Sequence, residues 1–201
     1  MLAKCAALGS LSVASALSLP QAIDAWDAHE SARKATPWNE LGPFYKRQAP
    51  KATHLRRPSD VGIPLAVSGR VLNTRGNAIP GATLEIWHAN HLGHYDLDGY
   101  RFRTTLSTPD SGKYAFDSII PGHYPDRVCQ HVHYLITAPG HKPLTTQMYF
   151  ATDSAFEGDP DKNYTKDPLV QSRDLIRPVT LSGEPKRLLA SVTFEIVLEQ
   201  L

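Results

Sequence analysis

Residues 82–89 read ATLEIWHA, and this stretch decides the fold because its apolar and polar side chains alternate. Ala82, Leu84 and Ile86 fall on one face of an extended chain, and the residues between them point the other way. A period of two is typical of a β-strand with one face in a core. The stretch therefore predicts such a strand.

The same period continues in both directions from about residue 64 onward. Turn signals rich in glycine and proline, such as NTRGNAIPG (73–81), TPDSG (108–112) and APGHKP (138–143), separate the strand candidates. Short strands without a long amphipathic helix favour an antiparallel sandwich or barrel, and we expect an all-β, antiparallel β-sandwich. Helix is expected only in the first 35 residues, as a short N-terminal helical or irregular extension, and around DPLVQSRDL (167–175). The other strand candidates are LAVSGRVLN (65–73), FRTTLST (102–108), KYAFDSI (113–119), VHYLITA (132–138), PLTTQMYF (143–150) and SVTFEIVLE (191–199).

We expect three parts in the chain: an export signal over residues 1–22, an N-terminal arm over 23–63 and a β-sandwich domain over 64–201. Lys4, a run of small and apolar residues, and ASA at 14–16 together resemble a cleavable signal. We therefore expect a periplasmic or secreted protein. The alternative is a retained N-terminal helix, packed on the body or on a second subunit of a homo-oligomer, in a cytoplasmic protein. The run is too short and too rich in serine for a membrane span.

The chain has 201 residues and a formal net charge of +1, which gives no electrostatic reason to expect nucleic acid or an anionic membrane as partner. The polar stretch 153–178 is long for a connection inside a β domain. Long loops of this kind often have a function, so we expect residues 153–178 to form the rim of a pocket.

Two histidines, His131 and His133, begin the strand predicted within RVCQHVHYLITAPGH (127–141). Side chains at i and i+2 share a face of a strand, so both imidazoles point into one space, which suits a metal ion. Tyr95 in GHYD and Tyr124 in PGHYPD lie in turns, outside any apolar alternation. The alternative reading of each tyrosine is a ring at the edge of the core with its hydroxyl in water.

A further histidine cluster, His88, His91 and His94 in WHANHLGHYD, has a spacing of three that would suit a helix. Asn90, Gly93 and the preceding strand favour a strand end and a turn instead, and a buried, hydrogen-bonded His88 is expected. Cys129 is expected to be a small buried hydrophobe.

Several blocks in a fixed order carry a resemblance to a known family. They are GPFY (42–45), SGRVLNTRGNAIPGATLEIWHAN (68–90), LSTPDSGKYAFDSIIPGHYP (106–125), and H-x-H followed by APGHKPLTTQMYF (138–150). Over about residues 40–155 the chain resembles the intradiol ring-cleavage dioxygenases, which include catechol and protocatechuate 3,4-cleaving enzymes.

The resemblance implies a non-haem Fe(III) ion bound by Tyr95, Tyr124, His131 and His133. Phenolates are hard anionic donors that suit a ferric ion. The implied reaction uses O2 to cleave an aromatic diol between its two hydroxyl-bearing carbons, giving a cis,cis-muconate-type diacid. Tyr124 would leave the metal and take a substrate proton. Catechol, hydroxyquinol and protocatechuate all remain open as the substrate.

Two further residues take roles only through the resemblance. The family arginine lies three positions before the first histidine, where this chain has Val128, and Arg127 lies one position earlier. On a strand, a shift of one residue would turn the Arg127 side chain to the other face. The alternative interpretation of Arg127 is a surface arginine paired with Asp126. Gln147 matches a family glutamine close to the iron, and its alternative is a polar residue on a solvent-exposed face.

Two other functions remain open at this stage. One is a non-catalytic β-sandwich binding module, since sandwiches host many functions. The other is a zinc-dependent hydrolase or isomerase using His131 and His133, which needs a carboxylate or a third histidine as a further ligand.

Overall fold

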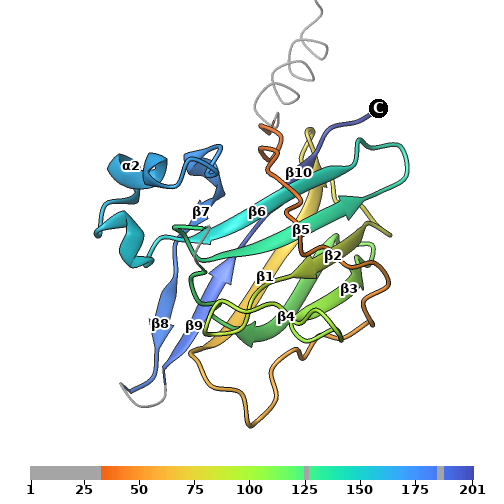
Figure 1. Cartoon of the computed structure of the whole chain (residues 1–201). Helices are drawn as coiled ribbons and strands as arrows, with labels where there is room; N and C mark the ends of the chain where they lie inside the picture. Colours follow the sequence, from red (N-terminus) through yellow and green to blue (C-terminus); the bar gives the residue numbers. More distant parts are fainter. Residues whose placement is uncertain (1–32, 125–126, 185–187) are drawn as a thin grey trace, which may run out of the picture. The chain divides into compact units, whose positions relative to one another are not determined.

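The computed structural model describes residues 33–124, 127–184 and 188–201, and the export signal predicted over residues 1–22 lies outside them. The described residues form two β-sheets (Figure 1). In the first, β1 (Pro64–Asn73) pairs antiparallel with β4 (Lys113–Ile119) and parallel with β9 (Leu189–Thr193) and β10 (Ile196–Leu198). A short strand, β8 (Thr180–Ser182), extends this sheet antiparallel to β9.

The second sheet has the strand order β3-β2-β5-β6-β7. Its first four strands, β3 (Arg103–Ser107), β2 (Thr83–Trp87), β5 (His131–Thr137) and β6 (Leu144–Phe150), pair antiparallel. The two-residue strand β7 (Ile176–Arg177) runs parallel to β6. This sheet carries the two histidines of the predicted metal site, at the start of β5.

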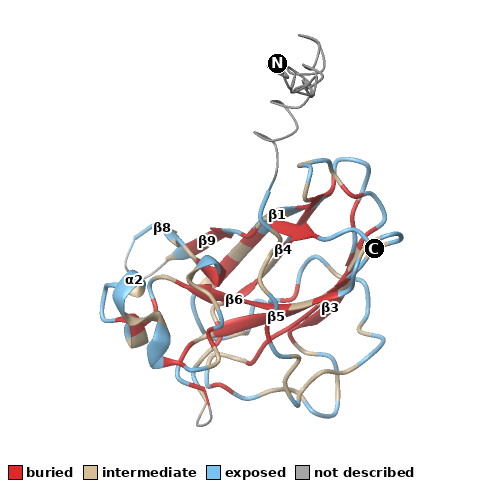
Figure 2. Cartoon of the chain, turned by 90° about the horizontal axis from the view of Figure 1, so that it is seen from above, coloured by how far each residue is buried: buried red, intermediate tan, exposed pale blue. Residues whose placement is uncertain are grey.

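The two sheets face each other across a single apolar core. Leu84 of β2 and Tyr134 of β5 belong to the same buried cluster as Leu65 of β1. Buried residues run along β5 and β6 in Figure 2. The predicted all-β sandwich is therefore confirmed. The apolar residues that alternate along each strand are the ones that face the core.

The pairing is not antiparallel throughout, because β1 has parallel partners, β7 runs parallel to β6, and both sheets are mixed. Alternation reveals which face of a strand is buried, but it carries no information on the direction of the neighbouring strand. The C-terminal residues return along β1 in the same direction, and this could not be predicted from local sequence.

The strand predicted over residues 191–199 is interrupted. β9 and β10 keep one register along β1, since Leu65 lies opposite Ala190 and Val71 opposite Ile196. The ladder breaks at Phe194, whose carbonyl oxygen accepts a hydrogen bond from the Tyr114 hydroxyl at 2.6 Å. Tyr114, on β4 at the other side of β1, thus donates to the backbone at the point where β9 ends.

The long connection from residue 153 contains only short helices. They are η1 (Ser154–Phe156), α2 (Pro160–Asn163), η2 (Tyr164–Lys166) and η3 (Arg173–Leu175). The helix expected over 167–175 is therefore limited to its last three residues. Asp167 precedes Pro168, which disfavours helical backbone, and its carboxylate accepts the Leu169 N–H.

The arm packs on the second sheet through residues 39–45. The Asn39 N–H donates to the Thr145 carbonyl oxygen, and the Tyr45 hydroxyl donates to Glu85. The arm therefore covers the face of the second sheet that points away from the core. No helix within the described ranges is long and apolar enough to cross a membrane.

Candidate metal centre

The two histidines of the H-x-H pair lie on the face of β5 opposite to the core. Val132 and Tyr134, which alternate with them, are fully buried between the sheets, whereas the rings of His131 and His133 lie 4.7 Å apart, centroid to centroid. Both histidines are themselves almost fully buried, because the arm and the loops cover this face. The prediction that they share one space is confirmed.

Both tyrosines reach this space from loops outside the strands. The Tyr95 hydroxyl oxygen lies 3.1 Å from His133 Nε2, and the Tyr124 hydroxyl oxygen lies 3.5 Å from His131 Nε2. The two phenol rings meet edge to face with centroids 5.7 Å apart. The structure thus brings together all four residues of the predicted ligand set, which we call the tetrad.

The orientation of the His131 ring suits a metal ligand. Its Nδ1 lies 2.7 Å from the Cys129 carbonyl oxygen, and because a carbonyl only accepts, Nδ1 must carry the proton. The lone pair of Nε2 then faces the tetrad, as in metal sites where a histidine donates its other nitrogen to a carbonyl. β5 begins at His131, so Cys129 lies off the strand as a buried residue of the core.

The spacing of the donor atoms also fits a shared cation. Two donors about 2.1 Å from one first-row metal ion, at coordination angles of roughly 90–110°, lie about 3.0–3.5 Å apart. The two tyrosine–histidine pairs, at 3.1 Å and 3.5 Å, match this range. The tetrad residues therefore fit a metal ion of this size.

Burial sets the protonation of the tetrad. It lowers the pKa of His131 to about 3, assisted by the positive charge of Arg127, and it holds the pKa of His133 well below its usual value. Both imidazoles are therefore neutral, which is the form that binds metals. Burial also raises the pKa of the Tyr95 and Tyr124 phenols, so only a strong local positive charge, such as a bound cation, would ionise them at neutral pH.

Aromatic contacts fix two of the four rings. Phe44 of the arm stacks on Tyr95 with centroids 4.3 Å apart and planes 17° apart. Trp87 of β2 lies opposite His133 in the sheet and stacks on its ring at 4.9 Å and 5°. Neither contact was predicted as part of the site, although the alternation of ATLEIWHA placed Trp87 on the correct face.

Comparison with known proteins gives the chain its family. A family model described as Dioxygenase matches residues 41–200. A catechol 1,2-dioxygenase from Pseudomonas sp. (strain EST1001) is 35% identical over 157 residues, which are 65% of this chain and 52% of the relative. The chain belongs to the intradiol ring-cleavage dioxygenase family.

Solved structures agree with this membership of the intradiol family. The dioxygenase domain of a dioxygenase carbohydrate-binding protein fusion from Streptomyces sp. SirexAA-E has a TM-score of 0.72 at 33% identity, covering 84% of this chain and all of that domain. A catechol 1,2-dioxygenase from Acinetobacter sp. ADP1 has a TM-score of 0.70 at 26% identity, covering 91% of this chain and 69% of that one. The chain spans about half the length of the curated relatives it matches.

The arginine of this intradiol dioxygenase-family chain lies inside the site despite its shifted position. Arg127 is 7% exposed, and its Nη1 lies 3.3 Å from His131 Nε2. The alternative of a surface arginine is therefore wrong, and Asp126 lies outside the described residues. The shift is absorbed because Arg127 precedes β5 and forms an isolated bridge with Tyr124, so strand alternation does not govern its direction.

Gln147 lies opposite His133 in the β5–β6 ladder and is fully buried, so its alternative as a solvent-facing residue is wrong. Its Nε2 donates to the Glu40 carbonyl oxygen at 2.7 Å, and its Oε1 accepts from the Tyr149 hydroxyl at 2.9 Å. The Tyr149 hydroxyl also accepts from Arg127 Nη2 at 2.8 Å. The Tyr149 hydroxyl thus joins Arg127 to Gln147, a contact that its place in LTTQMYF (144–150) did not indicate.

The other histidines near the tetrad do not add a third imidazole ligand. His88 is buried and bonds the Ala89 carbonyl oxygen and the Ser118 hydroxyl, both at 2.7 Å, as expected. Within the described residues, no group of three His, Cys, Asp or Glu side chains could hold a metal ion. The zinc alternative therefore lacks its required further ligand in the described part of the chain.

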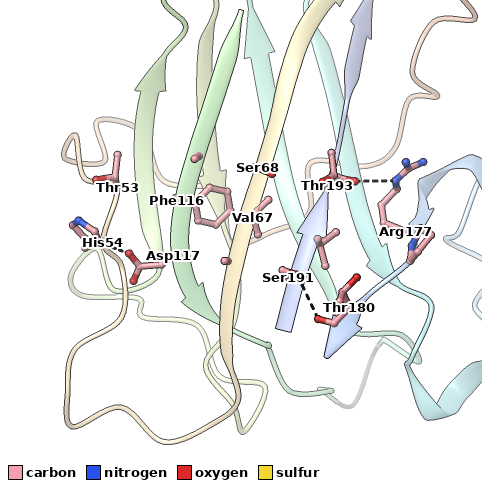
Figure 3. A pocket seen from close by; sticks show the side chains of 14 residues that line it. Thr53, His54, Val67, Ser68, Phe116, Asp117, Arg177, Thr180, Ser191 and Thr193 are labelled. Carbon is pink, nitrogen blue, oxygen red and sulfur yellow. Dashed lines mark hydrogen bonds and ion pairs between the residues drawn. The ribbon is translucent and has the colours of Figure 1, made fainter. Parts of the chain in front are cut away.

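A separate groove of about 740 Å³ lies on the other sheet (Figure 3). Small side chains such as Ser68 and Ser191 line it, with the His54–Asp117 pair on one side and Arg177 on the other. No tetrad residue lines this groove. The tetrad histidines lie on the opposite sheet.

Proposed function

We propose that this chain is an Fe(III)-dependent intradiol dioxygenase that uses O2 to cleave a catechol-type diol between its hydroxyl-bearing carbons, giving a cis,cis-muconate-type diacid. One observation carries the proposal: two phenol oxygens and two imidazole Nε2 atoms converge, in pairs at 3.1 Å and 3.5 Å, in a chain of this family. Relatives named catechol 1,2-dioxygenase and hydroxyquinol 1,2-dioxygenase support an ortho-diol as the substrate class.

In this proposal the tetrad would hold the iron. The metal would supply Lewis-acid chemistry and a template for the diol and O2. Two anionic phenolates and two neutral imidazoles suit Fe(III), whereas two histidines with one carboxylate suit Fe(II).

The two tyrosines would have different roles, because Phe44 restrains their rings to different degrees. Tyr95 lies nearly parallel under Phe44, whereas Tyr124 meets Phe44 only edge-on at 6.0 Å. Tyr124 is therefore the ring with more freedom to move, and its phenolate oxygen would accept one proton from a substrate hydroxyl, leaving Tyr124 as a neutral phenol.

Arg127 would favour the anionic form of the diol. Its guanidinium is buried beside the tetrad, where a positive charge acts at short range and low dielectric. Both polar atoms of the Gln147 side chain are already bonded, which supports a role in holding Tyr149 and the arm in place.

Iron binding provides the first test. The purified chain loaded with Fe(III) should show a visible tyrosinate-to-iron absorption band. Tyr95→Phe and His133→Ala should lose the iron and the band. Tyr100→Phe is the control, because Tyr100 donates to the Arg47 carbonyl oxygen outside the tetrad. Full iron content and full activity in either tetrad variant would overturn the ligand set.

Substrate preference is the second test. Catechol, hydroxyquinol and protocatechuate should be compared with ultraviolet detection of the diacid product. A wild-type protein that retains iron but opens none of these rings would overturn the proposed reaction.

Export is a separate proposal that rests on residues 1–22 alone, and N-terminal sequencing of the secreted protein would test it. A homo-oligomer likewise stays a prediction, which the mass in solution would test.

A further inference from the structure

The Arg127 guanidinium needs several anchors to stay at its observed position, because a long, flexible side chain has many alternative rotamers. Nη2 donates to the Tyr149 hydroxyl at 2.8 Å, and Nη1 donates to His131 Nε2 at 3.3 Å. In the proposed function, His131 Nε2 binds the metal, so the second contact would be lost in the loaded enzyme. Of these two contacts only the bond to Tyr149 would then remain, and one hydrogen bond leaves the guanidinium free to rotate about it.

Asp167, from the long connection after β6, supplies a further anchor. Its Oδ2 lies 3.4 Å from Arg127 Nε and 3.5 Å from Nη2, and it also accepts the Cys129 N–H at 3.1 Å. Its Oδ1 accepts the Leu169 N–H at 2.9 Å. One carboxylate thus contacts both the guanidinium and the backbone that follows Arg127.

Because the ion pair between Asp167 and Arg127 is buried, its loss should have a large effect on the position of the guanidinium. Asp167 is 1% exposed, and within the described ranges it is the only acidic side chain in an ion pair with Arg127. A buried cation without its counter-charge is unstable in place and moves toward water if the structure permits. Removing the Asp167 charge should therefore release the guanidinium without removing Arg127.

We propose that Asp167 is a positioning residue that orients Arg127 toward the diol, an inference that rests on the proposed function. It gives the connection over residues 153–178 a specific task in this chain. Asp167 would not touch the substrate. It would act through the direction of the guanidinium.

Asp153 offers a matched control in the same connection. It is 2% exposed, and its Oδ2 accepts the Gln130 N–H at 2.6 Å, one residue beyond the amide bound by Asp167. Its side-chain partner is the His123 ring, with Nε2 at 2.9 Å, and it has no ion pair with Arg127 within the described residues. Asp167→Asn and Asp153→Asn each remove one buried negative charge and keep an amide oxygen as acceptor. Only Asp167→Asn removes the counter-charge of Arg127.

The experiment compares steady-state kinetics, iron content and the visible band in the wild type, Asp167→Asn, Asp153→Asn, Arg127→Gln and the double variant Arg127→Gln/Asp167→Asn. Asp167→Asn should lower kcat by about 10–100-fold with iron content and the band unchanged, as for other residues that orient a charged group in a site. Asp153→Asn should change kcat by less than about 3-fold, because it leaves Arg127 paired. The double variant should be no slower than Arg127→Gln alone, because the two residues act as one unit.

Two results would overturn the inference: equal kcat losses in the two aspartate variants, or losses that multiply in the double variant. A crystal structure of Asp167→Asn gives a readout that does not depend on activity. A guanidinium displaced from the tetrad supports the inference, and an unmoved one rejects it. A wild-type protein without ring-opening activity would count against the proposed function, and the crystal structure would still decide whether Asp167 positions Arg127.

Discussion

Gly42 allows the arm to pass closer to the His133 ring than a residue with a side chain could. Its φ of +73° lies in the left-handed region, and a Cβ built there would lie 3.1 Å from His133 Cε1. The ring is already stacked on Trp87, so it has little room to yield. The absence of a Cβ at Gly42 therefore leaves room for the His133 ring of the tetrad.

Gly42→Ala should lower the free energy of unfolding by about 1–2 kcal/mol, from left-handed strain, and should also weaken iron retention by moving His133. The matched control is Gly140→Ala, which has a similar φ of +71° but no atom within 4 Å of the added Cβ. Chemical denaturation and iron titration of both variants would check this. If both retain iron equally well, the contact with His133 has no consequence for the site.

Phe44 contributes to the site through its stack on Tyr95, which is the closest aromatic pair in the described part of the chain at 4.3 Å. Phe44→Leu should cost about 0.5–1.5 kcal/mol beyond the lost apolar area and should shift the visible band by loosening the Tyr95 ring. Trp38→Leu serves as the control, because Trp38 is an aromatic residue of the same arm that is 57% exposed. Absorption spectra and unfolding curves identical to wild type for Phe44→Leu would contradict this role.

The break between β9 and β10 depends on a close backbone approach from β1. A Cβ on Gly69 would lie 2.0 Å from the Phe194 carbonyl oxygen and 2.7 Å from Tyr114 Cε1. The absence of a side chain at Gly69 thus leaves room for the Phe194 carbonyl, which accepts its hydrogen bond from Tyr114 between β9 and β10.

Gly69→Ala should destabilise the protein by about 3 kcal/mol or more, because backbone has to move to relieve the overlap. Ser68→Ala, one residue earlier on β1 and exposed, should change stability by less than about 0.5 kcal/mol. Urea unfolding at neutral pH measures both. Equal stability of the two variants would show that the break tolerates a side chain at position 69.

The alternation of apolar and polar residues predicted the strands that have one face packed against the core. β2 and β5 alternate because one face meets the core, and the same alternation put His131 beside His133. The break at Phe194 could not be predicted, since its contacts with Tyr114 and Gly69 come from distant strands.

The tetrad could be predicted only through the family resemblance, because its tyrosines come from loops whose paths no periodicity describes. Asp167 was missed for a related reason. Its contacts with Arg127 and Cys129 depend on the fold of the long connection, and DPLVQ gives no signal that a carboxylate will be buried.

A single buried histidine links the two sheets of the molecule. His88 follows β2 of the second sheet, and its Nε2 bonds Ser118 of β4 in the first sheet at 2.7 Å. Burial lowers its pKa to about 4 from an ordinary 6.5, and nearby arginines contribute. The folded protein therefore keeps His88 neutral at pH values where the unfolded chain binds a proton.

This difference makes stability depend on pH. The contribution is fully present above pH 6.5, where His88 is neutral in both states, and it is lost as the pH falls from 6.5 toward 4. Between pH 7 and pH 4.5 the loss should be about 2–3 kcal/mol. His88→Asn cannot titrate, so the stability gap between wild type and variant should narrow by that amount in urea unfolding at the two pH values. A gap that stays constant with pH would contradict this assignment.

The pairing of β1 with β9 and β10 joins residues 64–73 to residues 189–198. During synthesis on the ribosome, one side of the β1 backbone has no partner until residues 189–198 have emerged, more than a hundred residues later. Open edges of this kind recruit other strands, and long-range pairings form slowly. The nascent protein should therefore be most prone to self-association, and most dependent on chaperones, just before β9 and β10 are translated.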